Sequence, residues 1–381
     1  MKKIKNLLTI LLSAVIIFSV FSFGISTTSA ASGEILIGCS TGLTGSFAET
    51  GERIKKGILM AQDEVNQKGG VLGKKLRVTF EDDQCNAAMA VNTVNKLISE
   101  NVVALIGPTL SATIMGTEQI IKRAGIPCMA AGTSPKVVEL GNPYVFRIRP
   151  SDTITAKSAA KFAVEKLEAK KVGILFNNDE FGTGARDVMQ KYLKSINIPT
   201  ICEGHNTGDK DMTGQLIKMK TADVNVIIVW THEQETAITG RQLKELGIDI
   251  PVIGSPASST PQTLSLMDKE WIEGWYSVTD LVPTDPAPNV VSFVKKYQAR
   301  YKMTPELNAA ANYGAVLILA DAMKRAKSTD GRKLQAALMK TKNLQGVLCV
   351  YYANDKGEMV HNVSIAQVKD KVPQLVTHVS E

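Results

Sequence analysis

The sequence predicts an α/β protein made of two successive units, each a parallel sheet covered by helices on both faces. Short apolar runs alternate with segments in which apolar residues recur at helical spacing, and this alternation occurs twice along the chain. The strand-like runs are apolar along their whole length, which is typical of strands buried on both faces. A chain of 381 residues with 44% hydrophobic residues is also long enough for two cores.

The first half of the chain holds five predicted strands and three predicted helices. The strands lie at 34–39, 76–81, 102–106, 127–131 and 144–147, and the helices lie at 54–66, 87–100 and 113–124. The stretch 66–83 is the most informative part, because Gly69 and Gly70 end a helix and a new strand of period two follows Gly73. The strand ends in three acids, 81–83, which we expect to lie outside any binding site.

The second half repeats the pattern. Its predicted strands lie at 171–176, 200–203, 224–230, 251–254 and 274–279, and its helices at 154–167, 184–195, 212–219 and 235–246. A proline-rich segment, 283–288, is followed by predicted helices at 290–301, 309–327 and 331–341 and by strands near 347–352 and 364–368.

Helices without a sheet of their own must pack on an existing one, so we expect the chain to return to the first unit. The predicted division is a first lobe of 32–149 plus 282–347 and a second lobe of 150–281 plus 348–381. Three crossovers would then form a hinge between two lobes, with a ligand cleft between them that closes around its ligand.

The N-terminus reads as a signal peptide spanning residues 1–31. Lys2, Lys3 and Lys5 precede an apolar run, and small residues lead to a cleavage site after Ala30 or Ala31. The alternative is a retained membrane anchor, since the apolar run is near the lower length limit for a span. Removal of three lysines changes the formal charge from +7 to 7 − 3 = +4. We expect an exported, periplasmic protein, and the mild charge without a basic block predicts no nucleic-acid partner.

Motifs for metal binding and catalysis are missing from the sequence. The four histidines are scattered without metal-ligand spacing, and five cysteines form no C-x-x-C pair, so we predict mostly buried free thiols with room for one disulfide. Neither G-x-S-x-G nor H-E-x-x-H occurs. The prediction is therefore a protein that is not an enzyme and carries no cofactor or metal. An exported enzyme remains the competing class.

Several motifs, in order and spacing, resemble the type I periplasmic solute-binding proteins of ABC transporters, specifically the Leu/Ile/Val-binding branch. They are 42–46 (GLTGS), the stretch 66–83, 107–113 (GPTLSAT), 125–127 (GIP) and 178–182 (NDEFG). The resemblance covers the whole mature chain. It implies two Rossmann-like lobes, non-enzymatic capture of a small ligand with a carboxylate, and delivery to an ABC permease by a monomer. A ligand-sensing receptor module of the same fold is the alternative; a related repressor would need an N-terminal DNA-binding unit.

The loop 107–113 leaves a predicted strand and enters a helix at its N-terminus, where free N–H groups favour a carboxylate. Ser111 adds a hydroxyl there, or else merely caps the helix. The resemblance implies that Ser111 binds the ligand carboxylate. It further implies that the loop at 132–134 grips the ligand and that aromatic or polar residues wall the pocket. The predicted ligand-binding residues are Ser111, Gly132, Thr133, Ser134, Phe181, His232, Phe47, Thr50, Leu110, Pro256 and Tyr313.

One departure from the family pattern concerns the ammonium of an amino-acid ligand. Amino-acid binders of this family place an acid after the strand that here reads 251–254, and this chain has Ser255-Pro256-Ala257 and no acid up to 260. A buried ammonium without a charged partner is costly. Two possibilities therefore stay open. Either Glu233, Glu235 or Asp280 replaces the missing acid, or the ligand is a carboxylate without an amine.

Overall fold

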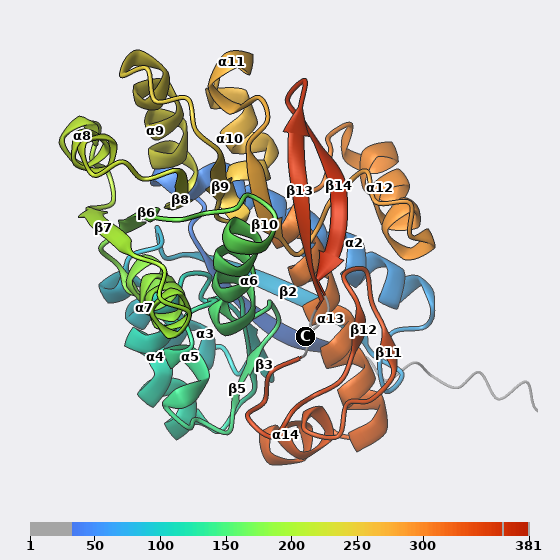
Figure 1. Cartoon of the computed structure of the whole chain (residues 1–381). Helices are drawn as coiled ribbons and strands as arrows, with labels where there is room; N and C mark the ends of the chain where they lie inside the picture. The colour runs from blue at the N-terminus through green and yellow to red at the C-terminus, as the bar shows by residue number, and fades with distance from the viewer. Residues whose placement is uncertain (1–32, 360–361, 380–381) are drawn as a thin grey trace, which may run out of the picture. The chain divides into compact units, whose positions relative to one another are not determined.

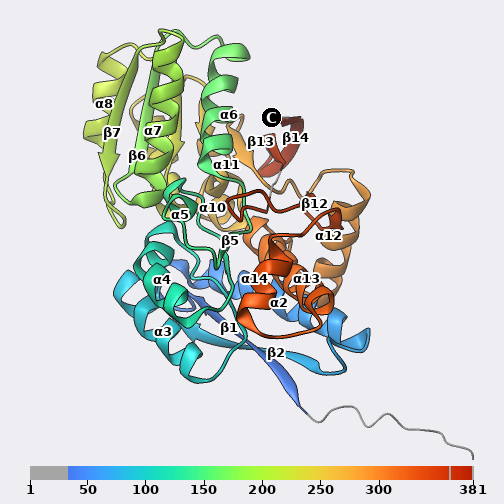
Figure 2. The same ribbon diagram turned by 90° about the horizontal axis from the view of Figure 1, so that it is seen from below.

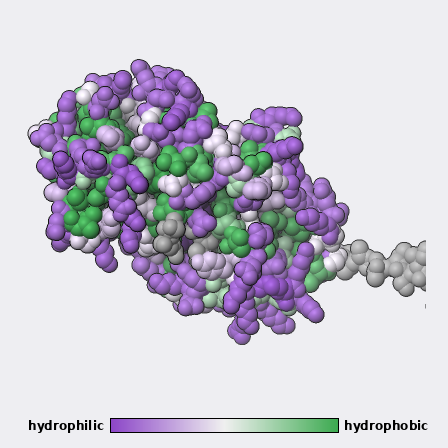
Figure 3. All heavy atoms as spheres, turned by 45° about the vertical axis from the view of Figure 1, so that its right-hand side comes forward, coloured by the Kyte–Doolittle hydropathy of each residue, from purple (hydrophilic) through white to green (hydrophobic). Residues whose placement is uncertain are grey.

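The computed structural model describes residues 33–359 and 362–379. The predicted signal peptide, 1–31, lies outside the described residues. Within the described ranges, no helix combines the length and the apolar character needed to cross a membrane. Hydrophilic side chains cover most of the face drawn in Figure 3. Large hydrophobic residues that stay exposed include Ile217 and Val291, which belong to different helices.

The first lobe is built on a five-stranded sheet with the order β2-β1-β3-β4-β5, in which every pairing is parallel. Its strands are β1 (Glu34–Thr41), β2 (Lys75–Asp82), β3 (Ala104–Ile106), β4 (Cys128–Ala130) and β5 (Val145–Arg147). Its helices are η1 (Gly45–Phe47), α2 (Ala48–Gln67), α3 (Ala87–Ser99), α4 (Ser111–Ala124), α5 (Lys136–Glu139), α12 (Pro288–Tyr301), α13 (Leu307–Ala326) and α14 (Gly331–Leu338).

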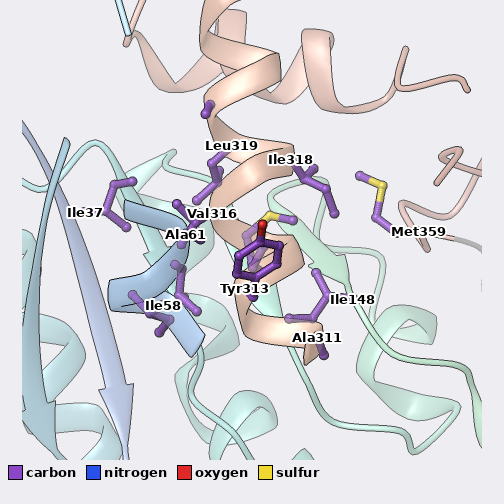
Figure 4. Close-up of a cluster of buried hydrophobic side chains, with 14 of the residues drawn as sticks. Ile37, Ile58, Ala61, Ile148, Ala311, Tyr313, Val316, Ile318, Leu319 and Met359 are labelled. Atoms are coloured by element: carbon purple, nitrogen blue, oxygen red, sulfur yellow. The ribbon is translucent and has the colours of Figure 1, made fainter. Parts of the chain in front are cut away.

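The core of this lobe joins segments that are far apart in the sequence. Helix α13 packs against α2, and Ile58 and Ala61 on α2 meet Val316 and Leu319 on α13 in one buried cluster (Figure 4). The late helices therefore belong to the first sheet, as expected for helices that lack a sheet of their own. A short ribbon of β11 (Leu344–Gln345) and β12 (Val350–Tyr351) follows them.

The second lobe is built on a seven-stranded sheet with the order β14-β13-β10-β9-β8-β6-β7 (Figure 1). Its strands are β6 (Val172–Asn177), β7 (Thr200–His205), β8 (Val226–Trp230), β9 (Val252–Gly254), β10 (Tyr276–Thr279), β13 (Val363–Lys369) and β14 (Val372–Val379). Its helices are α6 (Asp152–Glu165), α7 (Glu180–Ser195), α8 (Thr213–Thr221), α9 (Glu233–Glu245), η2 (Pro256–Ser259), α10 (Pro261–Leu266) and α11 (Lys269–Ile272). Helices α6 and α7 lie side by side (Figure 2).

The α/β class and the order of the predicted elements are confirmed, with two corrections to the second sheet. Strand β14 was not predicted. Strands β13 and β14 pair with each other in antiparallel fashion, and β13 is also antiparallel to β10, so the sheet is mixed. The reason is local, because β13 and β14 are joined by a tight turn at Asp370 and Lys371, and a hairpin forces its two strands to run antiparallel.

The stretch 66–83 forms the predicted turn. Gly69 and Gly70 have φ of 90° and 73° after helix α2. The side chain of Asn66 then holds the next strand, since its amide accepts from Leu76 N at 2.7 Å and donates to Leu76 O at 2.8 Å. The acid Asp83 accepts from Ser40 Oγ at 2.7 Å. The stretch thus fixes how α2 joins β2.

The predicted residue bounds of the two lobes stay a prediction. Tyr351 and Met359 are buried in the same core cluster as Ile37 of β1, and Met359 is drawn beside that cluster in Figure 4. We therefore propose that the third crossover follows Met359 rather than lying near 348.

All five cysteines are free in the structure. Cys39 in β1, Cys128 in β4 and Cys349 are buried, as predicted for most of the cysteines. Cys85 is half-buried in the turn after β2, with a φ of 54°.

Candidate functional site

A cavity is lined by loops from both lobes. Most of its lining residues follow the carboxyl ends of parallel strands, which is where α/β sheets bind ligands. The segments are, after β1, Phe47 and Thr50; after β3, Thr109 to Ser111; after β4, Ala131 to Thr133; after β5, Arg149; after β6, Phe181; after β8, His232 and Glu233; and after β9, Pro256, Ala257 and Thr260.

Most of the predicted ligand-binding residues lie together on this cavity. The nine that line it are Phe47, Thr50, Leu110, Ser111, Gly132, Thr133, Phe181, His232 and Pro256. Their contact with a ligand stays a prediction. Ser134 does not line the cavity, although it is fully buried next to Thr133.

Tyr313 does not line the cavity either. Its hydroxyl donates to Glu64 Oε2 at 3.0 Å, and its ring packs at 5.2 Å against Phe293 inside the core of the first lobe (Figure 4). Helix α13 starts at Leu307 beside the cavity, and Tyr313 lies nearly two turns further along it. The side chain therefore supports the fold of the first lobe rather than the cavity wall.

The first lobe contributes a cavity wall with hydrogen-bond donors. Ser111 is the first residue of α4, and Leu110 is its N-cap residue, whose N–H is satisfied by Thr113 Oγ1 at 3.1 Å. Ser111 is therefore not the capping residue. Its Oγ accepts from Ser134 N at 3.2 Å, which leaves the hydroxyl hydrogen to donate. Together with the first N–H groups of α4, it can bind a carboxylate.

Glycine is needed at position 132 for the loop after β4 to approach α4. A Cβ atom there would lie 2.8 Å from Ser111 Cα and 2.8 Å from Ile114 Cδ1. Next to it, Thr133 is held in place because its Oγ1 donates to Asp152 Oδ2 at 2.9 Å. The loop thus forms a close-packed wall with a fixed hydrogen-bonding direction.

The second lobe contributes an aromatic wall. His232 stacks on Phe181 with ring centroids 5.1 Å apart, and its edge meets Phe47 of the first lobe at 5.2 Å. His232 Nε2 lies 2.7 Å from Asp179 Oδ2. Burial alone would lower the pKa of His232, but the hydrogen bond and charge of Asp179 raise it above its ordinary value. This hydrogen bond orients the imidazole.

Direct contacts join the two lobes around the cavity. Lys136 Nζ lies 3.0 Å from Glu180 Oε2 at the edge. Thr50 of the first lobe accepts from Gln262 Nε2 at 3.4 Å and donates to Glu233 Oε1 at 3.5 Å, and both of these residues belong to the second lobe. The structure therefore has the lobes in contact across the cavity.

The three acids considered as an ammonium partner have different surroundings. Glu233 lines the cavity. Glu235 is buried away from it and accepts from Gly208 N at 2.7 Å. Asp280 accepts two hydrogen bonds from Arg149, at 2.8 and 2.9 Å. Among these three, only Glu233 lines the cavity.

A family model described as periplasmic binding protein matches residues 34–373. The chain belongs to this family.

This periplasmic binding protein is 25% identical over 317 residues to the leucine-, isoleucine-, valine-, threonine-, and alanine-binding protein of Pseudomonas aeruginosa, covering 83% of this chain and 84% of that one. It is 27% identical over 350 residues to the Leu/Ile/Val-binding protein homolog 1 of Brucella suis, covering 91% and 92% of the two chains. The resemblance to the Leu/Ile/Val-binding branch is thus confirmed.

Solved structures confirm the predicted fold of the periplasmic binding protein. The leucine binding protein LivK of Thermotoga maritima has a TM-score of 0.85 at 24% identity, covering 91% of this chain and 98% of that one. LivJ of Streptococcus pneumoniae in complex with isoleucine has a TM-score of 0.84 at 25% identity, with 91% and 99% covered. A solute binding protein of Rhodopseudomonas palustris with 3,4-dihydroxy benzoic acid has a TM-score of 0.82 at 20% identity, with 91% and 97% covered.

Sequence reasoning missed several lining residues of this binding protein. Arg149 follows β5, and that position at the carboxyl end of a predicted strand was a usable signal. Leu307 and Asn308 begin α13, which reaches the cavity only because the chain returns to the first lobe. Cys85 lines the cavity from the turn after β2, and nothing in its local sequence points there.

Proposed function

We propose that this periplasmic binding protein is the exported substrate-binding component of an ABC importer. It captures a small ligand that carries a carboxylate and delivers it to a membrane permease. It works as a monomer, is not an enzyme, needs no cofactor and does not bind nucleic acid. Its signal peptide is removed after Ala30 or Ala31 during export to the periplasm, and N-terminal sequencing of the exported protein tests that step.

The observation that carries the proposal is the wall formed by Ser111 and the start of α4 beside the loop Ala131 to Thr133. It offers a hydroxyl hydrogen and free backbone N–H groups at the positive end of a helix dipole. Isoleucine, bound by the Streptococcus pneumoniae relative, and 3,4-dihydroxy benzoic acid, bound by the Rhodopseudomonas palustris neighbour, share a carboxylate. A carboxylate is therefore the common group that this wall fits.

Binding proceeds by closure of the two lobes. The carboxylate docks on the first lobe at Ser111, and Phe181 and His232 then cover the ligand from the second lobe and exclude water. The ligand stabilises the closed state because it has more contacts there than in an open state. At 100 times its dissociation constant, a ligand raises the free energy of unfolding by roughly 2.7 kcal/mol.

A thermal-shift screen tests the function. The purified mature protein is titrated with the standard L-amino acids, with amine-free acids such as benzoate, and with neutral sugars as a contrast. The proposal expects a rise in melting temperature with at least one carboxylate and none with the sugars. A rise with a neutral sugar and with no carboxylate would refute it.

A further inference from the structure

The charges that line the cavity are unequal. Glu233 is the one acid among its lining residues. The other lining residues that can carry a charge are Arg149, whose guanidinium is held by Asp280 through two hydrogen bonds, and His232, which is hydrogen-bonded to Asp179. In the described part of the chain Glu233 forms no ion pair with either of them, although its negative charge contributes to the raised pKa of His232.

Glu233 lies where a negative charge is favoured, and most of its acceptor positions have no hydrogen-bond donor. It is the first residue of α9, where the helix dipole favours a negative charge. In the described part of the chain its side chain accepts one hydrogen bond, from Thr50 Oγ1 at the long distance of 3.5 Å, and it forms no ion pair. A carboxylate has about four acceptor positions, so most of those on Glu233 are available to a ligand.

A second acceptor faces the cavity from the first lobe. Thr133 Oγ1 donates its hydrogen to Asp152 Oδ2 at 2.9 Å, so toward the cavity this hydroxyl presents only lone pairs. Burial raises the pKa of Asp152 to about 6, and its carboxyl group also accepts from Thr155 Oγ1 at 2.8 Å, so it acts as the acceptor for both hydroxyls. The cavity thus combines donors near Ser111 with acceptors at Thr133 and Glu233.

We propose that Glu233, assisted by Thr133, binds an ammonium group of the ligand, and that the ligand is an amino acid rather than an amine-free carboxylate. This inference rests on the proposed function and specifies the ligand class for the same cavity. A zwitterion satisfies the donors at the start of α4 and balances the charge of Glu233. An amine-free acid would leave Glu233 uncompensated next to a second negative charge.

The position of Glu233 also links ammonium binding to closure. Glu233 and Gln262 belong to the second lobe, and Thr50 of the first lobe lies between them through hydrogen bonds of 3.5 and 3.4 Å. The wall formed by Ser111 and the start of α4 also belongs to the first lobe, like Thr50. A ligand with its carboxylate at Ser111 of the first lobe and its ammonium at Glu233 of the second therefore makes charged contacts with both lobes, whereas an amine-free acid makes a charged contact with the first lobe alone.

The test compares matched pairs of probes by isothermal titration calorimetry. Each L-amino acid is paired with the acid of the same skeleton without the amine: L-isoleucine with 3-methylpentanoate, L-phenylalanine with 3-phenylpropanoate and L-alanine with propanoate. The variants are Glu233→Gln, Glu233→Asp as a charge-preserving second variant, and Glu245→Gln as a control. Glu245 lies at the far end of the same helix, and its side chain is 61% exposed.

The wild type is expected to bind the amino acid of at least one pair on the order of 100-fold more tightly than its amine-free partner. Glu233→Gln should lose on the order of 100-fold affinity for that amino acid, because it removes one partner of a desolvated charge pair, and should bind the amine-free acid no less tightly than the wild type does. Glu233→Asp should lose less affinity than Glu233→Gln, and Glu245→Gln should match the wild type.

The two failures are distinguishable. If an amine-free acid binds the wild type as tightly as its amino acid, or if Glu233→Gln binds both members of a pair as the wild type does, the ammonium assignment is wrong and carboxylate binding stands. If neither member of any pair binds, nor any acid of the thermal-shift screen, the proposed function itself fails. The ligand-free melting temperature of each variant shows that it is folded.

Discussion

Gly184 offers a substitution that should weaken ligand binding without weakening the fold. It lies in α7 of the second lobe, facing the loop after β4 of the first lobe. A Cβ atom added at Gly184 would lie 2.9 Å from Ser134 Oγ, 3.4 Å from Pro135 Cδ and 3.5 Å from Ser134 Cβ. The contact with Ser134 Oγ is too short, while the other two are closer to ordinary van der Waals contact.

The expected effects of Gly184→Ala on affinity and on stability have opposite signs. Overpacking of this kind costs about 1–3 kcal/mol, and the clash exists only when the lobes are closed. Ligand affinity should therefore fall by roughly 5- to 150-fold. The ligand-free protein should keep or gain stability, because alanine is favoured over glycine inside a helix by up to about 1 kcal/mol.

Calorimetric titration with the ligand found in the screen measures the affinity, and denaturant unfolding of the ligand-free protein measures the stability. Ser134→Ala provides the rescue. It removes the clashing oxygen, and the remaining Cβ atom lies at an acceptable 3.5 Å from the added methyl group. The double variant should regain most of the lost affinity. Unchanged binding by Gly184→Ala, or a loss that Ser134→Ala does not restore, would refute the closed-state packing described above.

Three further predictions concern single groups. Ser111→Ala should weaken ligand binding by roughly 10- to 100-fold in calorimetry, because it removes a hydrogen bond to a charged group. The control variant Ser99→Ala, at an exposed position, should bind as the wild type does. Equal affinities of the two variants would show that Ser111 does not bind the ligand. Burial raises the pKa of Glu306 from 4.5 to about 7, so the folded protein keeps a proton that the unfolded chain releases, and the free energy of unfolding falls as pH rises through this window. In Glu306→Gln, the free energy of unfolding measured with denaturant should therefore fall less between pH 4.5 and 7, by an amount on the order of 3 kcal/mol. An unchanged pH dependence would show that Glu306 does not have a raised pKa. Asp179→Asn should lower the pKa of His232 in an NMR titration, because the charge of Asp179 raises it; a pKa that stays in place would show that another group is responsible.

The sequence was sufficient for the arrangement of elements, because the alternation of strands and helices has a strong periodic signal. The strand that escaped prediction was β14, whose residues Val372–Val379 include Pro373 and are largely exposed. Such a strand has no continuous apolar run and no clean alternation. Phe181, expected in a loop, lies instead in the first turn of α7, because Asp179 caps that helix by accepting from Gly182 N at 2.9 Å.

The sequence predicted residues that line the cavity where a loop directly follows a strand, and it misplaced a residue where a helix is buried on all sides. Ser111 and Gly132 follow strand ends, so their position was readable. Helix α13 is buried along nearly its whole length, so its sequence does not indicate which side meets the cavity, and Tyr313 was wrongly placed there. The choice among the three acids likewise required coordinates, since Glu233 and Glu235 are two residues apart and only Glu233 faces the cavity.

The most direct measurement of the central claim is mass spectrometry of the small molecules released when the purified protein is denatured. The account predicts a free amino acid, with its carboxylate held at Ser111 and its ammonium at Glu233. Release of a carboxylate without an amine would contradict the role of Glu233. Release of a bound molecule without any carboxylate would contradict the account as a whole.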